Sequence, residues 1–199
     1  FQWGALFPNM VKAIAPICGA ARIADHNKGF IESAIGVLKI APDFKAGNYK
    51  NPPLDALNAF GHVYSAWLFS QDFFRERLYK KIALETAADV VKFTQNYFKQ
   101  SDANDLVAMA NTWANADISA NIRFNNDFDA ALRAITCKAI VLPGATDLYF
   151  RVADSVYEVD KMSDAELRPI PSNWGHAAGF GASSADNIFI DKALTELLA

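Results

Sequence analysis

The chain has few cysteines, few histidines and no recognisable metal-ligand spacing. Its two cysteines, Cys18 and Cys137, cannot form a disulfide framework, and neither lies in a Gly-x-Cys-x-Gly turn or at a helix start that would lower its pKa. We interpret both as buried core thiols, which favours a reducing, cytoplasmic location. His62 has no second histidine or cysteine at ligand spacing, so the sequence predicts no metal site.

Clustered charge and long apolar runs are also missing. The net charge is −3 and basic residues form no cluster, which argues against nucleic acid as a partner. The longest apolar stretches, such as 11–18 and 139–142, are too short to span a bilayer, so no membrane partner is expected. No glycine-rich phosphate loop is present, because Gly179-Phe180-Gly181 lacks a preceding strand and a third glycine. We therefore expect no tightly bound cofactor.

The first residues, Phe1-Gln2-Trp3-Gly4, contain neither an initiator methionine nor a basic region followed by an apolar run. We therefore predict no signal peptide and expect that a segment upstream is missing. A length of 199 residues with 52% hydrophobic side chains is typical of one soluble globular domain.

The residue pattern predicts an α/β fold with a large helical insertion. Periodicity of the helical kind runs from about residue 27 to 129, interrupted by a loop at 43–54 that is rich in glycine, asparagine and proline. The remaining elements expected are a helix at 1–7, strands at 11–15, 138–143 and 167–170, and a last helix at 187–198. We predict an α/β core formed by residues 1–26 and 129–199, with an incomplete parallel sheet, and a helical lid at 27–128.

An acid and a histidine follow two of these strands. Asp147 comes after the strand at 138–143, and His176 follows the strand at 167–170 in Asn173-Trp174-Gly175-His176. Consecutive parallel strands can end side by side, so the two side chains are expected to meet as the acid and base of a hydrolase triad. The alternative is that Asp147 caps the following helix and His176 only ends a loop. No nucleophile is visible in either case.

Five motifs in order carry a family resemblance. They are Phe1-Gln2-Trp3-Gly4-Ala5-Leu6-Phe7-Pro8-Asn9-Met10-Val11, Ala20-Ala21-Arg22 with His26-Asn27, Ser101-Asp102-Ala103-Asn104, Thr146-Asp147-Leu148-Tyr149-Phe150, and Gly175-His176. Over essentially its whole length the chain resembles the homoserine O-acetyltransferase family of α/β-hydrolases.

The resemblance implies a role for the acid and the histidine. Asp147 resembles the triad acid and His176 the general base, while the serine of the Gly-x-Ser-x-Gly elbow would lie upstream of Phe1. It also implies an oxyanion hole upstream, an amino-terminal half or separate chain carrying the nucleophile, and acetyl-CoA or another acyl-CoA as a possible co-substrate. Lid helices would form a homodimer. With an alcohol as acceptor the protein is an acyltransferase, and with water it is an esterase.

The sequence departs from the homoserine enzymes at the acceptor site. Ala177 stands where those enzymes have an acidic residue after the triad histidine, and segment 84–92 lacks their arginine and tyrosine. A substrate carboxylate would lose its bidentate partner, so homoserine is not the expected substrate. The aromatic lid, with Tyr64, Trp67 and Phe69, suits a neutral or hydrophobic alcohol or acyl ester.

Arg22 and His26 lie just past the first strand and, with Tyr64, Trp67 and Tyr149, are the predicted substrate-binding residues. For Arg22 the alternatives are an ion pair with Asp25 or a helix carboxyl end. Aromatic stripes are also common in cores and dimer contacts. The competing function is a non-catalytic fragment or pseudoenzyme that acts as an interaction or dimerisation domain.

Overall fold

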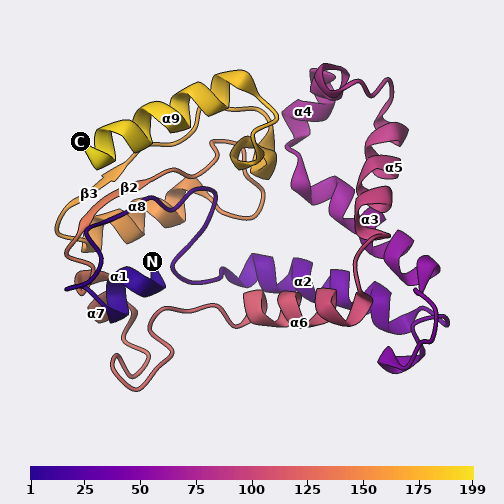
Figure 1. Cartoon of the computed structure of the whole chain (residues 1–199), viewed down its shortest axis with the longest axis horizontal. Coiled ribbons are helices and arrows are strands. Elements are labelled where there is room, and N and C mark those ends of the chain that lie inside the picture. Colours follow the sequence, from indigo (N-terminus) through magenta and orange to yellow (C-terminus); the bar gives the residue numbers. More distant parts are fainter. The chain divides into compact units, whose positions relative to one another are not determined.

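A computed structural model describes all residues, 1–199, and divides them into two compact units (Figure 1). The first unit joins Phe1–Arg22 to Ala116–Ala199, and the second is Ile23–Asn115. The chain therefore leaves the first unit once and returns to it once. The role of the second unit as a lid stays a prediction.

The first unit is built on a small parallel sheet with the strand order β1-β2-β3. Strand β2, Lys138–Val141, lies between β1, Ala13–Ile14, and β3, Ala165–Leu167. Isolated parallel bridges Ile17↔Leu142 and Gly144↔Ile170 continue both pairings past the strand ends. The segments that follow the three strands are thus held together at one edge of the sheet.

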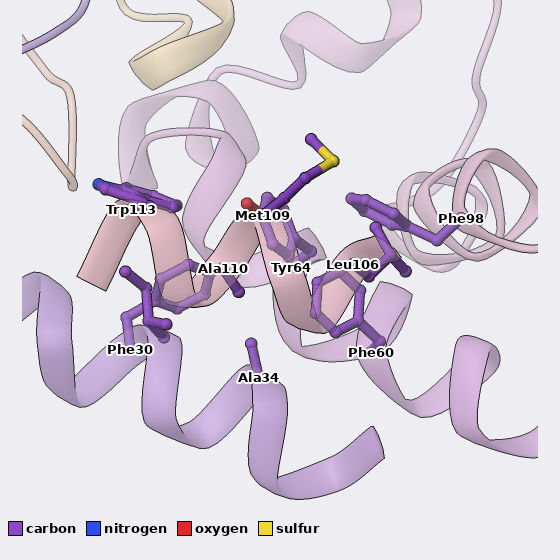
Figure 2. A pocket seen from close by; sticks show the side chains of 10 residues that line it. Phe30, Ala34, Phe60, Tyr64, Phe98, Leu106, Met109, Ala110 and Trp113 are labelled. Atoms are coloured by element: carbon purple, nitrogen blue, oxygen red, sulfur yellow. The ribbon is translucent and has the colours of Figure 1, made fainter. Parts of the chain in front are cut away.

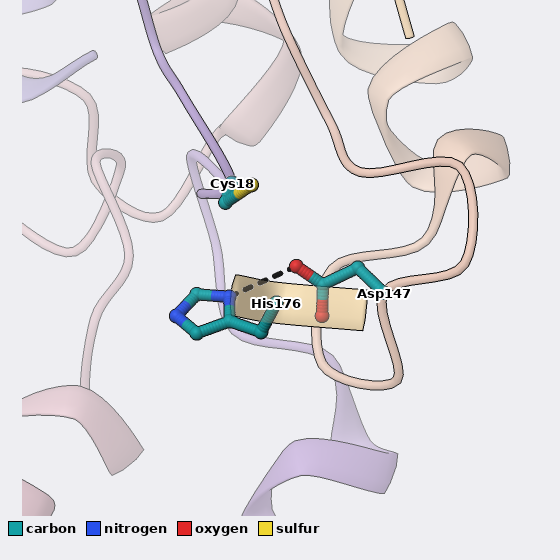
Figure 3. A group of neighbouring side chains, drawn as sticks. All are labelled: Cys18, Asp147 and His176. Carbon is teal, nitrogen blue, oxygen red and sulfur yellow. Dashed lines mark hydrogen bonds and ion pairs between the residues drawn. The ribbon is translucent and has the colours of Figure 1, made fainter. Parts of the chain in front are cut away.

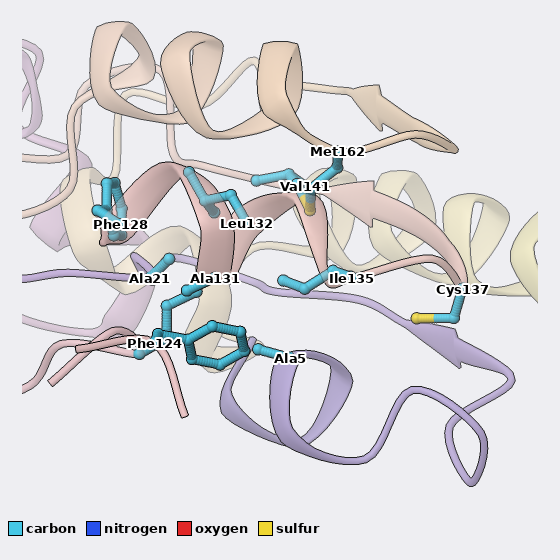
Figure 4. Close-up of a cluster of buried hydrophobic side chains, with 11 residues drawn as sticks. Ala5, Ala21, Phe124, Phe128, Ala131, Leu132, Ile135, Cys137, Val141 and Met162 are labelled. Atoms are coloured by element: carbon cyan, nitrogen blue, oxygen red, sulfur yellow. The ribbon is translucent and has the colours of Figure 1, made fainter. Parts of the chain in front are cut away.

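A hydrophobic core lies between β2 and two short helices, α1 (Gln2–Leu6) and α7 (Phe128–Arg133) (Figure 4). Leu132 and Ile135 are fully buried there, each contributing about 1.5–3 kcal/mol by leaving water. Val141 points into this core, so its strand neighbour Ile140 points to the other face. Helix α9, Ser184–Leu198, packs against β2, and α8, Val152–Lys161, packs against β3.

Helix α8 carries a buried carboxyl group that holds the segment after β1. Glu158 is only 3% exposed, and its Oε1 accepts a hydrogen bond from the Ala21 N–H at 2.7 Å. Burial raises the pKa of Glu158 from 4.5 to about 7, although the Ala21 hydrogen bond opposes the rise. The folded chain therefore holds this proton over a pH range in which the unfolded chain has released it.

This linkage predicts a pH-dependent stability. Because the folded pKa of Glu158 is the higher one, its stabilising contribution is complete below pH 4.5 and is lost as the pH rises through about 7. Glu158→Gln keeps an acceptor for Ala21 and cannot ionise, so the loss of unfolding free energy between pH 5 and 8 should shrink by up to about 3 kcal/mol. Denaturant unfolding at pH 5 and pH 8 measures the free energy of unfolding of both proteins. Glu32→Gln is the control, because Glu32 is exposed. An undiminished loss in Glu158→Gln contradicts the assignment.

The second unit consists of helices. They are α2 (Asp25–Ile40), η1 (Lys45–Gly47), α3 (Leu54–Leu68), α4 (Gln71–Arg75), η2 (Leu78–Ile82), α5 (Ala87–Phe98) and α6 (Ala103–Ala114). Helix α3 packs on α2 and α5, and α2 also packs on α6. A side chain at Gly61 would meet the Gln95 backbone at 2.7 Å, so glycine permits the close crossing of α3 and α5.

Side-chain caps fix the starts of several helices in this unit. Thr86 and Asp89 form a capping box at α5. Asp102 of the Asp-Ala-Asn motif caps α6 by accepting from the N–H groups of Asn104 and Asp105. Asp102 also accepts from the Tyr49 hydroxyl at 2.7 Å, which ties the loop after α2 to α6. This motif thus has a structural role within the helical unit.

The predicted position of the third strand needs correction. It was predicted at residues 167–170, but β3 spans Ala165–Leu167, and residues 168–170 continue only as backbone hydrogen bonds to Val141 and Pro143. Within the helical unit, α3 ends at Leu68, and Ser70 starts α4 by accepting from the Phe73 N–H. No helix of the chain is long and apolar enough to cross a membrane.

Candidate active site

Asp147 lies in the loop after β2, with its side chain completely buried. Its Oδ1 accepts hydrogen bonds from the backbone N–H groups of Tyr149, at 2.7 Å, and Phe150, at 3.3 Å. Its own N–H donates to the Gly144 carbonyl at 3.1 Å. These bonds fix the carboxylate and leave Oδ2 for another partner. The alternative that Asp147 caps the following helix does not hold, because α8 starts at Val152 with Arg151 at its cap.

His176 lies on η3, Gly175–Phe180, in the segment after β3. Gly175 has φ +67°, a left-handed conformation that glycine adopts without strain and that turns the chain into η3. The His176 side chain is 18% exposed, so the ring is largely shielded but still reachable. Such partial exposure is what a proton-transfer group needs, because a substrate must reach it.

The structure brings Asp147 and His176 together (Figure 3). The distance from His176 Nδ1 to Asp147 Oδ2 is 2.9 Å. An ionised carboxylate only accepts, so Nδ1 carries the proton and Nε2 has a free lone pair. Figure 3 shows this second nitrogen pointing away from Asp147. The pair therefore presents an oriented base, the arrangement expected from the sequence; its catalytic role remains a prediction.

Aromatic rings surround the imidazole. Tyr149 and Phe180 meet the His176 ring edge-on, with centroids 5.0 and 5.3 Å away, and Phe150 lies at 5.5 Å. Tyr149 is only 2% exposed. The predicted substrate-binding residue Tyr149 is therefore next to the pair, where it packs on the base and donates its backbone N–H to the acid.

Cys18 lies at the end of the β1 segment, close to both members of the pair. It is buried and has φ +46°, unusual for a residue with a side chain. Burial raises the pKa of the Cys18 thiol to about 12, and the charge of Asp147 adds to the rise. The thiol is therefore protonated at neutral pH and is not an activated nucleophile. Both cysteines are free and buried, as the sequence indicated.

Cys18, Asp147 and His176 each offer an atom that could bind a metal, and these atoms lie within 4.8 Å of one another. The Asp147 oxygens are already engaged, Oδ1 by two N–H groups and Oδ2 by His176. A metal would have to break the Asp147–His176 bond and displace the thiol proton. The expectation that the site works without a metal stays a prediction.

Arg22 does not form the predicted ion pair with Asp25. Its guanidinium lies 3.9 Å from the centroid of the Phe128 ring and 4.0 Å from Asp117. Asp25 instead pairs with Lys28 at 3.1 Å. The Asp25 alternative is therefore wrong, and Arg22 is engaged within the first unit. Its predicted contact with substrate stays a prediction.

The other predicted substrate-binding residues gather around Phe30 in the second unit. The ring of Trp67 contacts those of His26 and Phe30, with centroids 5.0 and 4.9 Å away, and Tyr64 meets Phe30 at 5.1 Å. Burial raises the pKa of Tyr64 to about 12, with a further contribution from Tyr97, so its phenol stays neutral. These residues form an aromatic cluster that contains no carboxylate, ammonium or guanidinium group.

Tyr64 also lines a cavity of about 220 Å³ among α2, α3, α5 and α6 (Figure 2). Phe60, Phe98 and Trp113 contribute further rings to its wall. Sequence reasoning found Tyr64 but missed the cavity, because its walls come from four separate helices. The helical periodicity of each segment was the only signal available.

No family model matches the chain. Among curated proteins it is 31% identical, over 202 residues, to an ethyl acetate hydrolase of Pseudomonas veronii, and the alignment covers 100% of this chain and 57% of that protein. It is 25% identical over 186 residues to a homoserine O-acetyltransferase of Trichormus variabilis, covering 89% and 50%. The chain thus spans about half the length of the curated relatives that it matches.

Among solved structures, an acetylester hydrolase from Corynebacterium glutamicum matches with a TM-score of 0.94 and 30% identity, over 98% of this chain and 56% of that one. A homoserine O-acetyltransferase from Bacillus anthracis matches with a TM-score of 0.84 at 21% identity, which bears on the fold alone. The predicted resemblance is confirmed: the homologues are esterases and homoserine O-acetyltransferases. The predicted fold class, the carboxyl-terminal part of an α/β-hydrolase with its last parallel strands and a large helical insertion, is confirmed as well.

Proposed function

We propose that this chain supplies the acid and the base of an α/β-hydrolase that transfers acyl groups from esters, with its nucleophilic serine in an upstream segment. The Asp147–His176 pair carries this proposal, because a buried, oriented carboxylate holds the imidazole by Nδ1 and leaves Nε2 for proton transfer. The resemblance at Thr146-Asp147-Leu148-Tyr149-Phe150 and Gly175-His176 supports the same roles.

In the proposed reaction, Nε2 of His176 takes the proton of the serine hydroxyl as its oxygen attacks the ester carbonyl. Asp147 stabilises the imidazolium that forms. The imidazolium then gives this proton to the departing alcohol, leaving an acyl-serine. His176 next takes a proton from the second acceptor, which attacks the acyl group, and returns that proton to the serine.

We propose water as the physiological acceptor and a short-chain acetate ester as the substrate. The relatives near 30% identity are named for the hydrolysis of acetate esters, whereas the homoserine O-acetyltransferase is 25% identical. Ala177 follows the histidine here, so no carboxylate is available at that position to hold an amino acid ammonium group. Acetyl-CoA would enter only as an alternative acyl donor.

The second unit is proposed as the lid. Its aromatic cluster of His26, Tyr64 and Trp67 around Phe30 contains no carboxylate, ammonium or guanidinium group, which suits a neutral ester better than a zwitterion. We also propose that the lid helices form a homodimer and that the protein is cytoplasmic.

The test uses the full-length protein, including the upstream segment. We expect it to hydrolyse ethyl acetate and to acetylate homoserine from acetyl-CoA at least about a hundredfold less efficiently, measured as kcat/KM. Faster acetylation of homoserine than ester hydrolysis would overturn the choice of water. The absence of both reactions would favour the non-catalytic alternative.

A further inference from the structure

We propose that Thr146 is a positioning residue that sets the geometry of the Asp147–His176 pair by joining the two loops that carry it. The Thr146 hydroxyl donates to the Ser172 carbonyl at 2.8 Å and accepts from the Gly175 N–H at 3.2 Å. Thr146 directly precedes the acid, and Gly175 directly precedes the histidine. The inference rests on the proposed function, since it assigns a part in that reaction.

We call these two hydrogen bonds the Thr146 bridge. The bridge joins the same two loops as the Asp147–His176 hydrogen bond. Residues 146 and 175 are joined by one bond and residues 147 and 176 by the next, and each pair is separated by 29 positions. A slip of one loop along the other would break both bonds at once. The hydroxyl is needed because it donates to one loop position and accepts from another, which neither a methyl group nor a carboxylate can do.

The loops are otherwise packed backbone to backbone. A side chain on Gly144 would meet the Gly175 carbonyl oxygen at 3.0 Å and Cβ of Asp147 at 3.4 Å. The Ala145 N–H donates to the Ile170 carbonyl at 3.0 Å. Thr146 therefore adds a second side-chain link, beside the Asp147–His176 bond, at a place where the two backbones already approach closely.

Buried polar groups anchor the far end of the bridge. The hydroxyl of Ser172 donates to Asp186 Oδ2 at 2.7 Å and accepts from the Trp174 N–H at 3.2 Å. Ser172 and Asp186 are each 5% exposed, and Asp186 belongs to the first turn of α9. Ser172, whose carbonyl accepts from Thr146, is thus anchored to α9. Through the Thr146 bridge, this anchored residue also fixes the loop that carries His176.

The proposal is tested in the full-length protein with Thr146→Val, which keeps the shape of the side chain and removes both bonds. Thr146→Ala removes the same bonds together with the γ-methyl group, and Thr146→Ser keeps the hydroxyl and removes only that methyl group. Thr195→Val is the matched control, because its hydroxyl donates to the Asp191 carbonyl at 2.8 Å on the exposed side of α9. Ethyl acetate hydrolysis and the proton NMR signal of the His176 Nδ1–H are measured for each variant.

We expect Thr146→Val and Thr146→Ala to lower kcat about 10- to 100-fold with little change in KM, because a misplaced base weakens the transition state more than substrate binding. Their Nδ1–H signal should move upfield or broaden as the bond to Asp147 loosens. Thr146→Ser and Thr195→Val should resemble the parent. Loss of the signal in His176→Asn assigns it to His176.

An unchanged kcat together with an unmoved Nδ1–H signal in Thr146→Val would overturn the proposal. So would a Thr146→Ser variant as impaired as Thr146→Val, since that result would point to the methyl group and its packing. If the parent hydrolyses no ester, the proposed function fails by itself. The NMR signal still decides whether Thr146 positions His176, because it needs no turnover.

Discussion

Replacing His176 with alanine is expected to lower kcat for ester hydrolysis by the full-length protein on the order of 10⁶-fold. Without the imidazole, no group receives the serine proton during attack or protonates the departing alcohol. The residual rate should come from the oxyanion hole and substrate binding alone. Steady-state hydrolysis of ethyl acetate at neutral pH measures the effect.

The control is His62→Ala. His62 lies on α3 with its side chain exposed, so its loss removes an imidazole without touching the pair. We expect His62→Ala to keep the activity of the parent, and both variants to keep its circular dichroism spectrum. A His176→Ala variant that retains more than about a tenth of the parent rate would show that another base does the work.

Replacing Asp147 with asparagine is expected to lower kcat about 10⁴-fold while preserving the fold. The amide oxygen can still accept from the Tyr149 N–H, as Oδ1 does now at 2.7 Å. The amide nitrogen would then face Nδ1 of His176 as a donor, which favours the tautomer with the proton on Nε2. That tautomer cannot take the serine proton, and the imidazolium also loses its charge partner.

Asp160→Asn is the matched control, because Asp160 is exposed and pairs with its neighbour Lys161 at 3.0 Å. It should behave as the parent does. A fall in activity of less than about tenfold in Asp147→Asn would mean that the 2.9 Å contact is structural. A large fall in both variants would point instead to a general effect of charge.

The existence of the strands and the acid–histidine pair could be predicted, because their signals are local. An apolar run followed by Asp147, and a second run followed by His176, place both side chains at the edge where parallel strands end. The end of β3 was harder to place. The residues of β3 that pair with β2 include the charged Glu166. The apolar run in the sequence therefore begins only after Glu166, and the strand was predicted further along the chain than it lies.

The surroundings of the pair could not be predicted in the same way. Cys18 lies 129 positions before Asp147, and its approach depends on the Ile17↔Leu142 bridge and on a left-handed backbone at Cys18. Glu158 looks like a solvated helix residue until α8 packs beside the segment after β1. Thr146 had a signal, its place directly before the acid, but only the partner loop reveals what its hydroxyl binds.

The most direct test of the account is mass spectrometry of the full-length protein after treatment with a fluorophosphonate, which reacts with activated serines. We predict a single adduct, located by peptide mapping on a serine upstream of Phe1, and no adduct in His176→Ala. Such a result would show that the base in this chain activates a nucleophile outside it. An adduct within residues 1–199, or one that forms equally well without His176, would contradict the central claim.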